Sequence, residues 1–138
     1  MTASMSTNKL STILLIDDDD ADNYIHQRTI NKAGIADHVE VRINARSALE
    51  YLASDVSAPP SLIFLDINMP GMNGWEFLAE YERLPPERRG SIVLVMLSTS
   101  DNPEDVARAQ SFDSVNGYRS KPLTGDMLVA IIEEFFPS

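Results

Sequence analysis

Short apolar runs alternate along this chain with longer segments in which apolar residues recur at every third or fourth position. Each run is bounded by polar or turn-forming residues, which is typical of a strand buried on both faces of a parallel sheet. The longer segments have the spacing of amphipathic helices. The pattern predicts strands at residues 13–16, 39–43, 62–65, 92–97 and 115–120.

Five helices are expected between and after these strands. The first should bury a stripe formed by Ile25, Thr29, Ile30 and Ala33 and end at Gly34, since glycine readily closes a helix. The other helices are expected over residues 45–53, from Trp75 to the Pro85-Pro86 pair, over residues 103–111, and along the stripe Met127, Leu128, Ile131, Ile132 and Phe135.

Regular alternation of strands and helices predicts an α/β fold with one five-stranded parallel sheet covered by helices on both faces. Sheets of this kind bind ligands at the carboxyl ends of their strands. The chain of 138 residues has the length of a single domain. We therefore expect a short tail over residues 1–9 and one domain over residues 10–138.

Composition limits which partners and which cellular compartment are expected for this chain. The chain has 11 basic and 21 acidic residues, a formal net charge of −10, so attraction to nucleic acid or to an anionic membrane is not expected. Its apolar runs are far shorter than the roughly 20 residues that span a bilayer. It has no cysteine and so needs no oxidising compartment. A cytoplasmic location is the resulting expectation.

Polar residues of a particular kind follow four of the predicted strands. Carboxyl ends of parallel strands lie at one edge of a sheet, so these side chains should converge. Three crowded carboxylates would favour a cation, and an all-oxygen ligand set suits Mg²⁺. The residues are Asp17 and Asp18 after the first strand, Asp66 after the third, Ser98 and Thr99 after the fourth, and Lys121 after the fifth.

Such a site could carry out phosphoryl transfer. A carboxylate can attack phosphorus and form an aspartyl phosphate when the charge on the transferred oxygens is neutralised. Mg²⁺, the ammonium of Lys121 and the hydroxyl of Ser98 could supply that neutralisation. No strong base would be needed, because a carboxylate is already ionised.

With these motifs in order, the chain resembles the response-regulator receiver family, the CheY-like domains, from about Leu10 to Phe136. The resemblance rests on residues 13–19, residues 65–74, the Ser98-Thr99-Ser100 segment, and Tyr118 followed by the Lys121-Pro122 pair. It implies a flavodoxin-like doubly wound (βα)5 fold with strand order 2-1-3-4-5. It also implies a stand-alone response regulator that works as a phosphorylation switch in a two-component pathway or phosphorelay.

The resemblance implies a role for each acidic residue of the site. Asp66 corresponds to the phosphoacceptor. Asp18, Asp66 and the backbone carbonyl of Asn68 correspond to direct Mg²⁺ ligands, and Asp17 to a residue that contacts metal-bound water.

Further roles follow from the same resemblance. Ser98 would donate a hydrogen bond to the phosphoryl group, and Lys121 would pair with another phosphoryl oxygen. Tyr118 corresponds to an aromatic residue that changes rotamer together with Ser98. The peptide bond between Lys121 and Pro122 is expected to be cis.

The partners implied are a sensor histidine kinase or a histidine phosphotransfer protein as donor, and an unidentified downstream protein. Homodimerisation through the face of the fourth helix, fifth strand and fifth helix is a further expectation. The protein would be a phosphoacceptor that assists its own phosphorylation and dephosphorylation, not an enzyme with a separate substrate. With the chain ending after its last helix, an output domain is expected on another molecule.

Alternative functions remain open at this stage. A receiver-like scaffold that no longer uses phosphate would carry the same fold. A phosphatase with an aspartyl-phosphate intermediate would need a second acid where Asn68 stands, and an EF-hand loop from Asp18 would need glycine at Asn23 and glutamate at Thr29.

Ordinary structural roles are expected for several other residues. Asp19 and Asp20 should be solvated, with Asp20 capping the first helix, and His26 should be an ordinary helical histidine. Trp75 should pack against the core close enough to the site to report on it.

Overall fold

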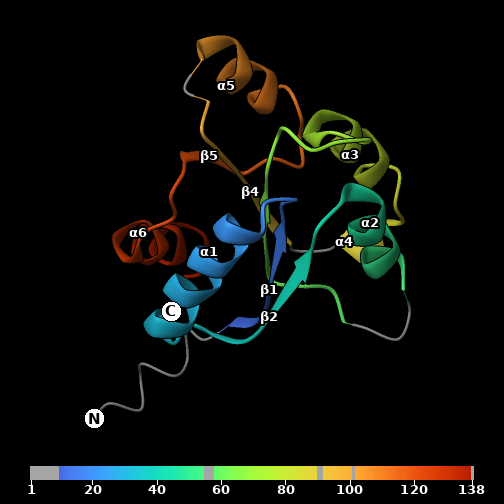
Figure 1. Cartoon of the computed structure of the whole chain (residues 1–138). Coiled ribbons are helices and arrows are strands. Elements are labelled where there is room, and N and C mark those ends of the chain that lie inside the picture. Colours follow the sequence, from blue (N-terminus) through green and yellow to red (C-terminus); the bar gives the residue numbers. More distant parts are fainter. Residues whose placement is uncertain (1–9, 55–57, 90–91, 101, 138) are drawn as a thin grey trace.

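The computed structural model describes residues 10–54, 58–89, 92–100 and 102–137 (Figure 1). Strands and helices alternate along the chain as predicted, apart from one additional short helix. The predicted tail, residues 1–9, lies outside the described residues. The strands are β1 (Leu10–Ile16), β2 (Ala36–Arg42), β3 (Leu62–Leu65), β4 (Val93–Ser98) and β5 (Gly117–Ser120); the helices are α1 (Asp20–Ala33), α2 (Ala45–Ala53), α3 (Gly74–Tyr81), α4 (Pro86–Arg89), α5 (Pro103–Gln110) and α6 (Gly125–Phe135).

The five strands form one parallel sheet in the order β2-β1-β3-β4-β5, which confirms the predicted fold and strand order. The helices cover both faces, with α1 and α6 together on one side and α2, α3 and α4 on the other (Figure 1). Strand order reverses between β1 and β3, which is where such sheets bind ligands.

The middle of the sheet is apolar on both faces. Leu14 and Ile63 pack toward α2 and α3, while Ile13 and Leu62 pack toward α1 and α6. All four side chains are fully buried. Burial of such a side chain contributes roughly 1.5 to 3 kcal/mol, so these strands form a rigid support for the residues at their ends.

One helix in the described residues was not predicted. The Pro85-Pro86 pair was expected only to end the third helix, yet Pro86 begins the short helix α4. Proline fits the first turn of a helix because that turn does not use its missing N–H. Arg88 then ties α4 to α2, since its Nε donates to the carbonyl of Leu52 at 2.9 Å.

The predicted buried stripe of α1 was wrong in part. Ile25 is 47% exposed and Ala33 is also exposed, whereas the helix buries Asn23, His26 and Ile30. A polar residue can occupy a buried face when it finds a hydrogen-bond partner, as Asn23 does by donating from Nδ2 to the carbonyl of Asp17. The apolar pattern could not reveal this, because it shows only whether each side chain is apolar or polar and not which contacts the side chain makes.

Smaller differences concern the ends of elements. β2 begins at Ala36, which pairs with Leu10, and it ends before Ile43, whose side chain is 55% exposed. The N-cap of α1 is Asp19 rather than Asp20. No helix in the described part of the chain is long and apolar enough to cross a bilayer.

Candidate functional site

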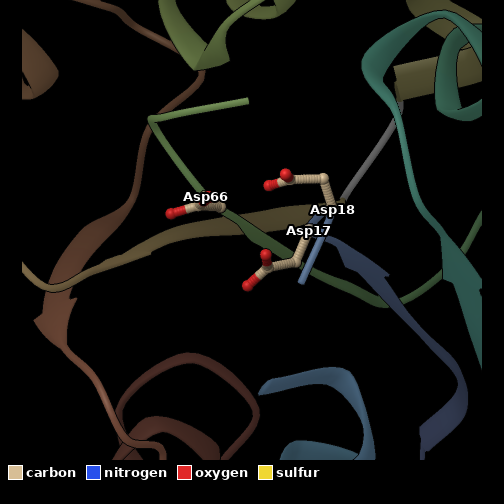
Figure 2. Close-up of side chains that lie close together, drawn as sticks. All are labelled: Asp17, Asp18 and Asp66. Atoms are coloured by element: carbon tan, nitrogen blue, oxygen red, sulfur yellow. The ribbon is translucent and has the colours of Figure 1, made fainter. Parts of the chain in front are cut away.

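Three aspartates meet at the carboxyl edge of the sheet. Asp17 and Asp18 follow β1, and Asp66 follows β3, whose last residue pairs with the last residue of β1. The backbone N–H of Asp66 donates to the carbonyl of Ile16 at 3.0 Å, which fixes the two strand ends relative to each other. Each aspartate offers a carboxylate oxygen within 4.8 Å of the others (Figure 2). The predicted convergence of these acids is therefore observed.

The environment of the three carboxylates differs. Asp17 and Asp66 are buried, at 5% and 8% exposed, while Asp18 is exposed. Burial, together with the nearby charge of Asp17, raises the pKa of Asp66 to about 6, although Lys121 opposes this shift. Crowded negative charge is thus unfavourable here without a cation.

The donor set fits Mg²⁺. This ion prefers oxygen ligands and keeps several of its waters, and the exposure of Asp18 leaves an open side where waters could remain. Asn68 lies two positions after Asp66 in the exposed part of the loop. Ligation through the Asn68 carbonyl stays a prediction.

Lys121 brings a positive charge into this cluster. Its Nζ donates to Asp17 Oδ2 at 2.7 Å and to Asp22 Oδ2 at 2.8 Å, and it lies 3.4 Å from Asp66 Oδ1. Burial alone would lower the pKa of Lys121, but the hydrogen bonds to Asp17 and Asp22 and the charge of Asp66 outweigh burial and raise that pKa. The ammonium therefore stays protonated at any physiological pH.

The end of β4 places Ser98 beside this lysine. Ser98 is fully buried, and its carbonyl accepts from the backbone N–H of Lys121 at 2.8 Å. Its hydroxyl accepts from the N–H of Ser100 at 3.0 Å. The bond between Lys121 and Pro122 is cis, as expected.

Tyr118 connects β5 with the loop that follows β4. Its side chain is half-buried, and its hydroxyl donates to the carbonyl of Ser100 at 2.7 Å. Ser100 in turn donates its N–H to the hydroxyl of Ser98. A chain of contacts thus runs from Ser98 to Tyr118, and the switching role of Tyr118 stays a prediction.

A close backbone approach holds the loop after β3 in place. The N–H of Gly74 donates to the carbonyl of Ile67 at 2.8 Å. A Cβ atom at Gly74 would lie 2.7 Å from the carbonyl oxygen of Asp66, closer than real contacts allow. Only glycine lets α3 begin so near to Asp66.

Sequence reasoning missed three residues of α1 that surround the site. Asp22 contacts Lys121, and Asn23 donates from Nδ2 to the carbonyl of Asp17 at 2.8 Å. His26 is 2% exposed and lines a small cavity, about 10 Å³, together with Asn23, Asp17 and Asp66. For Asp22 and Asn23 the available signal was their position in the first turn of α1, which starts at the same sheet edge as the acids.

Comparison with known proteins gives a consistent result. Residues 13–133 match the family described as the response regulator receiver domain. The chain is 32% identical over 125 residues to the probable methanogenesis regulatory protein FilR2 of Methanothrix harundinacea, covering 88% of this chain and 79% of that protein. It is 32% identical over 122 residues to the response regulator Rcp1 of a Synechocystis strain, covering 86% and 81%.

A solved structure supports the same conclusion. A two-component response regulator from Cytophaga hutchinsonii superimposes with a TM-score of 0.86 at 32% identity, covering 94% of this chain and 99% of that one. Family and fold agree with the arrangement of acids, hydroxyl and lysine at the sheet edge. This chain belongs to the response regulator receiver family.

Proposed function

We propose that the protein is a phosphorylation-activated switch of a two-component pathway, in which Asp66 accepts a phosphoryl group in a Mg²⁺-dependent reaction. One observation supports this most directly. Asp66 lies beside two other aspartates and a buried lysine, with carboxylate oxygens of the three acids within 4.8 Å of one another and Lys121 Nζ 3.4 Å from Asp66 Oδ1. This arrangement supports a role for Asp66 as the nucleophile, beside a group of acids suited to a cation and a positively charged lysine.

The chemistry required of Asp66 is a single displacement. Its carboxylate oxygen attacks the phosphorus of a donor, a P–O bond forms, and the bond from phosphorus to the leaving group breaks. With a phosphohistidine donor the leaving group is an imidazole nitrogen. Asp18, Asp66 and the Asn68 carbonyl would hold Mg²⁺, with Asp17 acting through a metal-bound water. The bound ion would supply positive charge that neutralises the transferred oxygens.

Two further side chains would stabilise the phosphoryl group. Lys121 would give up a hydrogen bond to a carboxylate oxygen in order to bind a phosphoryl oxygen. Ser98 keeps its hydroxyl proton available, because in its bond with Ser100 the hydroxyl oxygen is the acceptor. Donors that are already positioned stabilise a transition state with little reorganisation.

The output would pass through the contacts of Tyr118. Movement of Ser98 toward the phosphoryl group would disturb its bond with Ser100, whose carbonyl holds the Tyr118 hydroxyl. The face of α5, β5 and α6 would then change for a downstream protein or a second copy of the chain.

Receiver domains are generally phosphorylated by histidine kinases or phosphotransfer proteins, and we place this reaction in the cytoplasm. The protein would act as a phosphoacceptor and not as an enzyme on a separate substrate.

The direct test is phosphotransfer. Purified protein with Mg²⁺ and a phosphorylated histidine kinase or phosphotransfer protein should gain the mass of one phosphoryl group, and Asp66→Asn should gain none. Peptide mapping should place the modification on Asp66. Equal labelling of the Asp66→Asn variant would disprove the assignment.

Trp75 offers a second readout. It is buried at the start of α3, next to Gly74, with Arg108 over its ring at 4.7 Å. Its fluorescence should change with Mg²⁺ and again with beryllofluoride, a mimic of the phosphoryl group. If wild type gave no response to beryllofluoride, the scaffold function that does not use phosphate would be favoured instead.

A further inference from the structure

We propose that Asp22 is a positioning residue that holds Lys121 toward α1 and so weakens anion binding at Asp66. The inference rests on the proposed function, because it concerns the affinity of the same site for a phosphoryl group. Asp22 lies in α1, apart from the acids that directly follow β1 and β3, and most of its contribution is made through Lys121.

The contact of Lys121 with Asp22 is nearly as short as its contact with Asp17. Lys121 Nζ lies 2.8 Å from Asp22 and 2.7 Å from Asp17, but 3.4 Å from Asp66. The side chain of Lys121 is only 8% exposed. Both short hydrogen bonds therefore draw the ammonium away from the residue whose phosphoryl group it must reach.

Asp22 differs from Asp17 in one important respect. Among the described residues, Asp17 belongs to the group of carboxylates close enough to share a cation, and Asp22 does not. A cation bound there would compete with Lys121 for the charge of Asp17. Asp22 would then remain as the carboxylate whose hold on Lys121 is independent of the metal.

Loss of the Asp22 charge should affect an incoming anion in two ways that have the same sign. It removes a negative charge near the site, and it frees the ammonium of Lys121 for the anion. Asp22 is 33% exposed, so solvent screens part of this effect. One charge a few ångströms away in a watery surrounding changes an affinity about fivefold.

The affinity for Mg²⁺ should change in the opposite direction to the affinity for the anion. Without Asp22, the ammonium interacts more with Asp17 and Asp66, and one favourable negative charge is lost. A variant that merely disturbed the fold would weaken both ligands. Opposite changes in the two affinities therefore indicate a lost charge and not a disturbed fold, and the dependence on Lys121 needs a separate test.

The experiment uses Asp22→Asn, which keeps the shape and a hydrogen-bond acceptor but removes the charge. Asp20→Asn is the matched control, because Asp20 lies in the same first turn of α1 and is exposed. Trp75 fluorescence measures Mg²⁺ affinity, and then beryllofluoride affinity at saturating Mg²⁺. Asp22→Asn should bind beryllofluoride about fivefold more tightly and Mg²⁺ more weakly, whereas Asp20→Asn should stay close to wild type.

A second arm asks whether Asp22 acts through Lys121. In a Lys121→Ala background, Asp22→Asn should lose most of its effect on beryllofluoride affinity, since coupled residues are not additive. Unchanged or weaker beryllofluoride binding by Asp22→Asn, an equal gain in Asp20→Asn, or a full effect without Lys121 would overturn the inference. In each of these cases a responsive wild type would leave the proposed function standing, while an unresponsive wild type would remove both.

Discussion

The middle of the sheet and its carboxyl edge are buried to a similar degree but have opposite chemistry. Leu14 and Ile63, in the middle, are 0% exposed. Asp17 and Asp66, at the edge, are only 5% and 8% exposed. The same backbone therefore carries fully apolar side chains in one place and crowded charges a few residues further along.

The middle of the sheet contributes mainly to stability, whereas its carboxyl edge carries the residues of the candidate site. Apolar burial in the middle lowers the free energy of the folded state. Burial at the edge works against the charged form of Asp66 and raises its pKa. Lys121 offsets part of this cost through its contacts with Asp17 and Asp22. Carboxylates with a raised pKa beside a charged partner are typical of functional sites.

The largest expected effect belongs to the middle of the sheet. Leu14→Ala should lower the free energy of unfolding by about 2 to 5 kcal/mol, because it removes buried methyl groups and leaves a cavity. Urea denaturation measures this change. Val129→Ala, at a side chain that is 52% exposed, is the control and should change the value by less than about 0.5 kcal/mol. Similar losses in both variants would contradict the comparison.

Gly74→Ala tests the close packing of the start of α3 against the backbone of Asp66 at the carboxyl edge of the sheet. The new methyl group would meet the carbonyl of Asp66, so we expect a loss of about 1 to 3 kcal/mol in the free energy of unfolding, together with weaker Mg²⁺ binding. Gly125→Ala is matched to it, since a Cβ there meets nothing within 4 Å. A Gly74→Ala protein with wild-type stability and Mg²⁺ affinity would show that the loop can move without consequence.

Asp66→Asn should stabilise the metal-free protein at pH 7 by about 1 to 2 kcal/mol. The pKa of Asp66 is raised by folding, so the folded state binds its proton more tightly and the unfavourable effect of Asp66 is present above pH 6. It disappears as the pH falls through 6 to below 4, where the carboxyl group is protonated in both states. Urea denaturation of both proteins from pH 8 to pH 4, without Mg²⁺, measures the difference. A constant difference would refute the role of this charge.

The smallest effect is expected at His26. Burial, with the charge of Lys121 as a second cause, lowers the pKa of His26 against the opposing effect of Asp22 and Asp17. The unfolded chain takes up a proton first, so the contribution of His26 to stability should decrease as the pH falls below about 6.5. His26→Gln should remove this contribution, by less than about 1 kcal/mol, with the exposed His38→Gln as control. If the free energy of unfolding depended on pH in the same way in wild type and His26→Gln, this contribution of His26 would be excluded.

Some contacts of the site could be predicted and others could not. The positions of Asp17, Asp66 and Lys121 follow from local patterns, since each directly follows a strand that its own residues indicate. Asp22 lies within a run of acids and has no local feature that marks it. Its role depends on Lys121, which is 99 positions away along the chain.

The sequence by itself determined the order of strands and helices, the five-stranded parallel sheet and the edge where its polar residues gather. These features depend on periodicity and on residues close together in the chain. Only the tertiary structure decided that α1 buries Asn23 and His26 in place of Ile25, and that Lys121 is held by Asp22 as well as Asp17. Such contacts depend on how α1 and the segment after β5 pack at the sheet edge, where burial makes each unpaired polar group costly and so selects the partners that are within reach.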